Sequence, residues 1–144
     1  MPSVPNSSPA VSFPDCYVCG SANERGLHVS FSPHPSGGAC AEYTARTEHV
    51  GWPEVIHGGL LFTLMDEAVA WAVIYAGLHG VTAKAEVRFR EPARVGMKLF
   101  VRAWLIDPGR RLVRAKAEAR EGSEDGRLVA ELDAVMATTL GARD

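Results

Sequence analysis

The stretch that decides the fold is residues 51–76, which read GWPEVIHGGLLFTLMDEAVAWAVIYA. From Gly58 onward the residues suit a helix, and Gly77 ends it. Large apolar side chains lie on nearly every side of this helix, so it is either buried or spans a membrane. Asp66 and Glu67 near its centre favour burial, because each charge costs about 2.5 to 3.5 kcal/mol to insert into a bilayer. We therefore expect a central helix wrapped by a sheet.

Alternation of apolar and polar residues predicts six strands around this helix. Two precede it as a hairpin and four follow it, and the short connections among the four predict an antiparallel meander. Many inward positions are alanine, small enough for the sheet to curl closely around the helix. The expected fold is α+β, in the order strand, strand, helix, then four strands. The predicted strands are residues 27–32, 39–46, 82–90, 97–106, 112–120 and 127–138.

A chain of 144 residues has room for one domain, expected at residues 15–140. Residues 1–14, rich in proline and serine, and residues 141–144 are expected to be flexible. The net charge of -2 argues against a nucleic-acid partner, since it offers no field to attract a polyanion. Three cysteines without framework spacing, and a start without a basic or apolar leader, make a cytoplasmic location the expectation.

The helix begins at or just after His57-Gly58-Gly59, where no Ser, Thr, Asp or Asn stands to cap the amides of the first turn. Those donors are expected to be free, and glycines allow a substrate oxygen to approach them at the positive end of the helix dipole. This is the chemistry of an oxyanion hole. The alternative is that the glycines only permit a tight turn into the helix.

Asp66 and Glu67 supply the second half of a candidate site. Carboxylates in a buried helix are costly unless they are paired or functional, and desolvation raises the pKa of such a group toward the range of a general base. Alternatively, they face solvent or pair with an arginine such as Arg88 or Arg90. Asp66 follows His57 by nine residues, which on a helix is about 13 Å of rise and roughly 180° of rotation. If both act on one substrate, they come from two protomers of a twofold dimer.

The sequence resembles a known family, the hotdog-fold thioesterases, and within that family it resembles the thioesterases of the phenylacetate pathway. The likeness rests on Gly-Trp-Pro-x-x-x-His-Gly-Gly at residues 51–59 with Asp66 nine residues after the histidine. Three further strings match: Cys-x-x-Cys-Gly-x-x-Asn-x-x-Gly-Leu at residues 16–27, Phe-x-x-Pro-x-x-x-Gly at residues 89–96, and Leu-Val-Ala at residues 128–130. The resemblance covers residues 16–140.

The resemblance implies hydrolysis of an acyl-CoA thioester by a homodimer or a dimer of dimers, with no cofactor, no metal and no membrane partner. The amide of Gly58, helped by Gly59, would polarise the thioester carbonyl, and His57 would orient the loop or the substrate. Asp66 of the partner protomer would act as nucleophile or as general base for water. The expected substrate-binding residues are Arg90 and Arg94 for the CoA phosphates, and Phe62 and Met65 for the acyl group.

Three rival interpretations stay open. Cys16 and Cys19 could be half of a zinc site completed by His28, His34, His49 or Cys40, although structural zinc sites normally show two such pairs. A hydratase or dehydratase of the same fold would use a histidine such as the one in His49-x-Gly51-x-Pro53. A non-catalytic acyl-CoA-binding module would keep the free amides and would not need Asp66.

Overall fold

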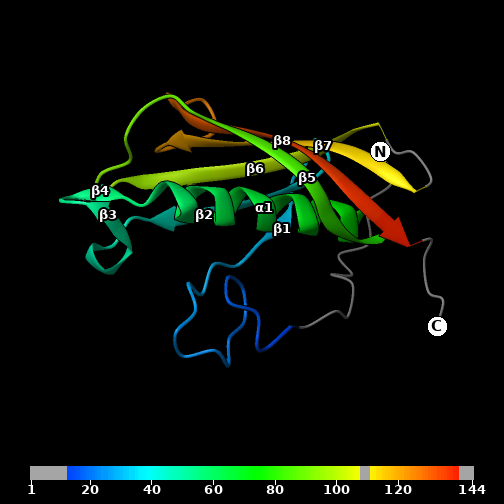
Figure 1. The fold of residues 1–144 in the computed structure, drawn as a ribbon, viewed down its shortest axis with the longest axis horizontal. Coiled ribbons are helices and arrows are strands. Elements are labelled where there is room, and N and C mark those ends of the chain that lie inside the picture. Colours follow the sequence, from blue (N-terminus) through cyan, green and yellow to red (C-terminus); the bar gives the residue numbers. More distant parts are fainter. Residues whose placement is uncertain (1–12, 108–110, 140–144) are drawn as a thin grey trace.

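The computed structural model describes residues 13–107 and 111–139 (Figure 1). Residues 1–12 and 140–144, which include most of the two segments expected to be flexible, lie outside the described residues. One long helix, α1 (Gly58–Tyr75), lies across one face of a curved antiparallel sheet, and Figure 1 shows the sheet arching over it. The predicted architecture of a single helix wrapped by about six strands is confirmed.

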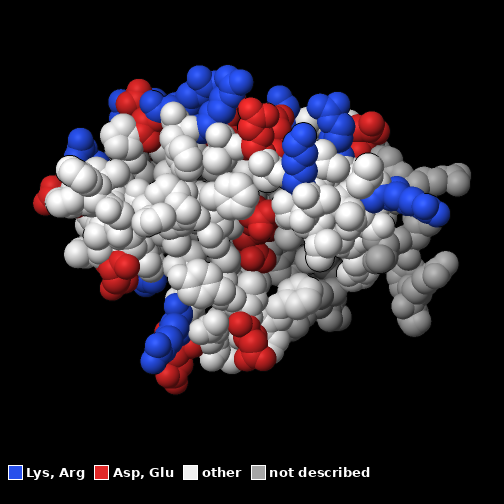
Figure 2. Space-filling model, in the orientation of Figure 1, with Lys and Arg blue, Asp and Glu red and all other residues white. Residues whose placement is uncertain are grey.

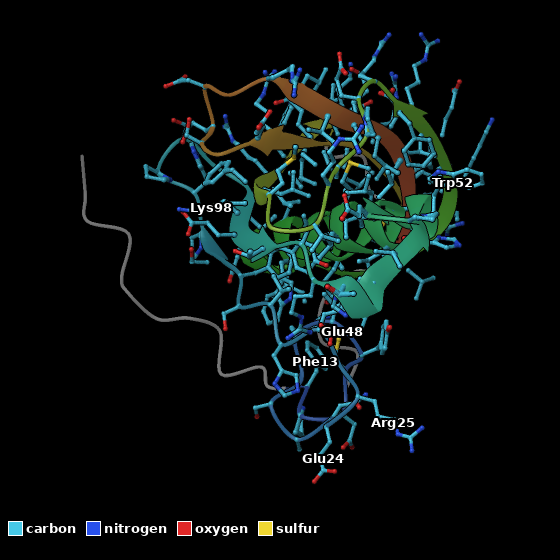
Figure 3. The ribbon with its side chains drawn as sticks, turned by 90° about the vertical axis from the view of Figure 1, so that its left-hand side faces the viewer. Phe13, Glu24, Arg25, Glu48, Trp52 and Lys98 are labelled. Atoms are coloured by element: carbon cyan, nitrogen blue, oxygen red, sulfur yellow. The ribbon has the colours of Figure 1, made fainter. Side chains whose placement is uncertain are left out.

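The sheet has the order β1-β2-β6-β7-β8-β5, and every pair in it is antiparallel. A separate two-stranded hairpin, β3 with β4, precedes the helix, and the exposed Trp52 projects from it (Figure 3). The short 3-10 helix η1 (Thr47–His49) leads into that hairpin. The strands are β1 (Ser32–Pro33), β2 (Ala39–Thr44), β3 (Val50–Trp52), β4 (Val55–Ile56), β5 (His79–Phe89), β6 (Lys98–Asp107), β7 (Leu112–Glu121) and β8 (Leu128–Thr139).

The meander expected for the last four strands holds only for β6, β7 and β8. β5 instead pairs with β8 and forms one edge of the sheet, while β6 pairs with β2. The chain crosses from β5 to β6 beside β4, where Ile56 N–H donates to Ala93 O at 2.8 Å and Val55 bridges Arg94. A sheet that closes around a helix brings strands distant in sequence together, so a short connection does not guarantee a hairpin.

The first predicted strand is also largely replaced by a loop. Leu27 and Val29 are buried as the alternation suggested, and their amides donate to Tyr17 O and Val18 O. Between them His28 has a φ of 54°, a left-handed conformation that interrupts an extended strand. Only two residues, β1, pair with β2. The N-terminal loop, residues 13–30, therefore projects from the body, with Glu24 and Arg25 far from the sheet (Figure 3).

The expectation of an alanine-lined inner face is confirmed. Leu64 and Met65 on α1 have no exposed surface, and the sheet positions that pack toward the helix are mostly small. The buried alanines of the sheet are Ala39, Ala41, Ala103, Ala115, Ala117, Ala119, Ala130 and Ala134. Methyl groups at these positions bring the sheet backbone close to the helix, so that large side chains on α1 fill the space between them.

By length and mean hydropathy (1.3), α1 also qualifies as a candidate membrane span. Eight of its residues are nevertheless buried within the protein. Those residues are Leu60, Leu61, Leu64, Met65, Ala68, Val69, Ala72 and Val73. The apolar character of the helix is therefore accounted for largely by the sheet that covers it.

Enlarging a buried alanine should destabilise this packing. Ala117 is 1% exposed on the inner face of β7, so Ala117→Val should lower the free energy of unfolding by about 1 to 3 kcal/mol through overpacking. Arg114→Val, on the outer face of the same strand, should change it by less than about 0.5 kcal/mol. Urea denaturation of both variants measures the difference. Equal effects would contradict the close packing of the sheet on α1.

Candidate active site

His57 caps the helix on which the candidate site is built. Its backbone is non-helical (φ -57°, ψ 130°), and its Nδ1 accepts a hydrogen bond from Gly59 N–H at 2.9 Å. The expectation that no side chain caps the first turn is therefore wrong for Gly59. It overlooked the imidazole, whose Nδ1 can accept a bond as a carboxylate oxygen does. The N–H of Gly58 finds no acceptor among the described residues, so one first-turn donor is free.

The loop before the helix fixes the His57 ring. His57 N–H donates to His49 O at 2.9 Å. The ring lies against the Gly51 backbone so closely that a Cβ on Gly51 would stand 2.8 Å from the imidazole Cδ2. A glycine is thus needed at position 51 so that the His57 ring can approach the backbone. The Gly-Trp-Pro string was the only sign of this in the sequence.

His49 supports the start of the helix through its ring and its backbone carbonyl. Its Nδ1 lies 2.6 Å from the Tyr43 hydroxyl, and the two rings stack. Burial lowers the pKa of the His49 imidazole below its ordinary value, and the charge of Arg46 lowers that pKa further. Because its ring is bonded to Tyr43 and its carbonyl to His57, His49 acts on the site by holding the helix start.

Phe89, at the end of β5, lies against Gly58. A Cβ built on Gly58 would lie 3.2 Å from the Phe89 ring, and Phe89 is 52% exposed. An apolar ring therefore lies beside the residue that carries the free amide. The sequence analysis noted Phe89 only as part of a family string, without a role. Its position beside Gly58 follows from the packing of β5 against α1.

Asp66 lies near the middle of α1 and faces β5. Thr82 Oγ1–H donates to Asp66 Oδ1 at 2.6 Å, and Thr82 also contacts Met136. The second oxygen, Oδ2, has no hydrogen bond or ion pair with the described residues. The arginine pairing considered above is absent there, since Arg90 bonds Glu131. Figure 2 shows acidic side chains in the middle of an otherwise largely uncharged face over α1 and β5.

Glu67 points a different way, because adjacent residues on a helix are about 100° apart. Its two carboxylate oxygens receive contacts from Cys16 and Cys19 of the N-terminal loop. Burial raises the pKa of the Glu67 carboxyl, while the hydrogen bonds from the two thiols lower it. Of the two adjacent acids, Asp66 is the one that forms a hydrogen bond with β5 among the described residues.

The four expected substrate-binding residues fall in different environments. Arg90 is exposed and forms an ion pair with Glu131 at 3.3 Å. Arg94 is exposed beside Val55, on the segment that connects β5 to β6. Phe62 is half-buried, whereas Met65 has 0% exposure and no surface available to a ligand in the single chain.

Comparison with known proteins gives a family. Residues 54–130 match the sequence model of the thioesterase superfamily. This span covers more than half of the chain and includes the helix start, Asp66 and β5. A search of curated proteins found no match.

Solved structures share the fold, known as the hotdog fold. A Streptococcus mutans protein bound to acetyl-CoA superposes with a TM-score of 0.72 at 19% identity, covering 81% of this chain and 91% of that one. The Escherichia coli PaaI protein of the phenylacetic acid degradation operon gives 0.72 at 23%, covering 80% and 82%. A Streptococcus pneumoniae hypothetical thioesterase with coenzyme A gives 0.72 at 22%, covering 81% and 91%. Structures of an aspartate-to-alanine mutant and a threonine-to-alanine mutant of a Streptococcus pneumoniae hypothetical thioesterase also share the fold.

The support of His57 by Gly51 can be tested without any assay of function. Since Nδ1 of His57 accepts the Gly59 N–H, the neutral ring should carry its proton on Nε2. Long-range proton–nitrogen NMR spectra of the wild type should show that tautomer. Gly51→Ala should displace the ring and restore a mixture of tautomers, whereas Val50→Ala in the same strand should not. An unchanged His57 signal in Gly51→Ala would contradict the close approach.

Proposed function

The chain belongs to the thioesterase superfamily, and from that premise we propose that it hydrolyses an acyl-CoA thioester to a carboxylic acid and CoA. The observation that carries the proposal is the free Gly58 amide at the start of α1 together with the Thr82-bound carboxylate of Asp66. The first supplies a donor for a carbonyl oxygen and the second supplies a base or a nucleophile. These are the two groups that acyl transfer to water requires.

Gly58 N–H polarises the thioester carbonyl in this proposal. It lies at the positive end of the helix dipole, where developing negative charge on oxygen is stabilised. Gly59 N–H is bonded to His57 and contributes mainly by keeping the imidazole in place. His57 is accordingly a positioning residue that fixes the first turn, and Phe89 places an apolar ring beside Gly58.

Asp66 promotes the attack on the carbonyl carbon. As general base it takes a proton from water, whose oxygen bonds to the carbon as the carbon–sulfur bond breaks and the CoA thiolate leaves. As nucleophile its carboxylate attacks the carbonyl carbon and displaces the CoA thiolate, which forms a mixed anhydride that water then hydrolyses to the acid and the free carboxylate. Thr82 holds one oxygen so that Oδ2 faces the substrate. In support, the altered aspartate and threonine of the two mutants are sixteen positions apart, the spacing of Asp66 and Thr82.

A second copy of the chain completes the site. β5 is a long edge strand with exposed Val81 (71%) and Phe89, the kind of edge that pairs with another chain. On this edge, Thr82 lies next to Asp66, to which it donates a hydrogen bond, and Phe89 lies next to Gly58. If two β5 strands pair antiparallel with Thr82 opposite the partner's Phe89, each Asp66 is brought toward the partner's Gly58.

The CoA phosphates are bound by local basic residues, since the chain as a whole carries a net charge of -2. Arg94 is better placed than Arg90 for this role. Arg94 lies beside Val55, next to the loop that leads to His57, whereas Arg90 is already paired with Glu131. Phe62 on α1 contributes to the acyl site, and Met65 is left out because it is fully buried.

Asp66→Asn should remove most of the hydrolytic activity. A thiol-release assay with aliphatic and aromatic acyl-CoAs should show kcat/KM lower by about 10² to 10⁴, the usual contribution of a positioned acid or base. Asp133→Asn, an exposed carboxylate on the outer face of β8, is the matched control and should keep wild-type rates.

Other outcomes distinguish the alternatives. Equal rates for Asp66→Asn and wild type would remove Asp66 from the mechanism. Binding of acyl-CoA without any hydrolysis would favour a binding module. Loss of the conjugated absorbance of an enoyl-CoA in water would favour a hydratase.

Mixed dimers test the composite site. Asp66→Asn and Gly58→Ala chains, each inactive alone, should regain activity when combined, because one of the two sites in a mixed dimer contains neither change. Random mixing in equal amounts should restore roughly a quarter of wild-type activity, since about half the dimers are mixed and half their sites are intact. Failure of purified mixed dimers to regain activity would contradict the sharing of sites between chains.

A further inference from the structure

Two thiols and a carboxylate that the proposed hydrolysis does not use lie together, about 100° around α1 from Asp66. Cys16 Sγ is 3.4 Å from Glu67 Oε2, and Cys19 Sγ is 3.7 Å from Glu67 Oε1. One ligand atom from each of the three residues lies within 4.8 Å of the other two. The cysteines come from the N-terminal loop and the glutamate from the middle of the helix, so the cluster exists only in the folded chain.

The spacing of these atoms suits a tetrahedral metal ion. Zinc binds sulfur at about 2.3 Å and carboxylate oxygen at about 2.0 to 2.2 Å, which places a sulfur and an oxygen ligand about 3.5 Å apart at the tetrahedral angle. Each thiol lies near this distance from a different oxygen of the carboxylate, 3.4 Å for Cys16 Sγ and Oε2 and 3.7 Å for Cys19 Sγ and Oε1. In addition, Cys19 N–H points to Cys16 Sγ at 3.4 Å, a contact that stabilises a thiolate ligand.

The charge of the cluster also favours a cation. No lysine, arginine or histidine forms an ion pair with Glu67 among residues 13–107 and 111–138. A divalent ion neutralises the Glu67 carboxylate and takes the place of the thiol protons.

We propose that Cys16, Cys19 and Glu67 bind a thiophilic divalent cation of the zinc type, with a solvent molecule as fourth ligand. Cys16 and Glu67 line a cavity of about 520 Å³, also bounded by Phe13 and Ile74, which gives an ion and its solvent ligand access. The indole N–H of Trp71, one helical turn after Glu67, is buried and lies beside Glu67 and Cys19, where it can support the ligands.

Glu67, the third protein ligand, is not among the residues that the sequence suggested for completing a zinc site with Cys16 and Cys19. Three of them are engaged elsewhere: the imidazole of His34 with Glu124, that of His49 with Tyr43, and the thiol of Cys40 with Ser32. His28 Nε2 lies 2.6 Å from Asn23 O. Glu67 was not considered, because it follows Cys19 by 48 residues and only the fold brings them together. The bound ion fastens the N-terminal loop to α1 and so forms one wall of the cavity.

Titration with Co²⁺ tests the site directly on the full chain, purified under reducing conditions and stripped of metal. One equivalent should produce the visible bands of tetrahedral cobalt and a thiolate-to-cobalt charge-transfer band, and Zn²⁺ should displace it. Cys16→Ser and Cys19→Ser should abolish the charge-transfer band, and Glu67→Gln should weaken binding by more than about tenfold. Cys40→Ser, which removes the thiol outside the cluster, should bind like the wild type.

A second measurement needs no variant. Zn²⁺ should protect two of the three thiols of the native wild type from a thiol-modifying reagent and raise the Tm. Absence of a 1:1 cobalt complex, equal binding by Cys16→Ser and wild type, or zinc protection of no thiol would each overturn the proposal. These readouts do not involve thioester hydrolysis, so the metal site and the proposed function stand or fall separately.

Discussion

The structure depends on the burial of one helix that is apolar on almost every side. A helix of this kind has no face that suits water, so a single sheet must curve around it. The curvature is possible because the sheet presents methyl groups, such as those of Ala103 and Ala117, where larger side chains would hold it away from the helix. The order of the strands follows from this closure: β5 reaches the edge beside β8 because the sheet has curled.

Burial of the helix also determines what its two carboxylates do. Asp66 and Glu67 are the acids on α1, and both are half-buried and hydrogen-bonded to another segment. Asp66 obtains Thr82 from β5, and Glu67 obtains two thiols from the N-terminal loop. Two adjacent residues therefore tie the helix to two different segments, β5 and the N-terminal loop. One connection belongs to the proposed catalytic site and the other to the proposed metal site.

Much of the candidate site could be predicted from the chain, and the errors have physical causes. The helix start at Gly58 and the place of Asp66 follow from periodicity and helix geometry. The cap on Gly59 was missed because histidine is an uncommon N-cap, and its ring could be placed only once Gly51 was seen to lie against it. The first strand was overestimated because alternation reports burial, and it does not report the left-handed turn at His28.

The sequence by itself determined the fold class, the extent of the central helix, the alanine-rich inner face of the sheet and the family, because these depend on local periodicity and on short strings of residues. Only the tertiary structure decided which strand lies at the edge, that Phe89 lies against Gly58, and that Cys16 and Cys19 meet Glu67. Such contacts join residues far apart in the chain. Their geometry is fixed by how the sheet closes around α1, and no local pattern encodes that closure.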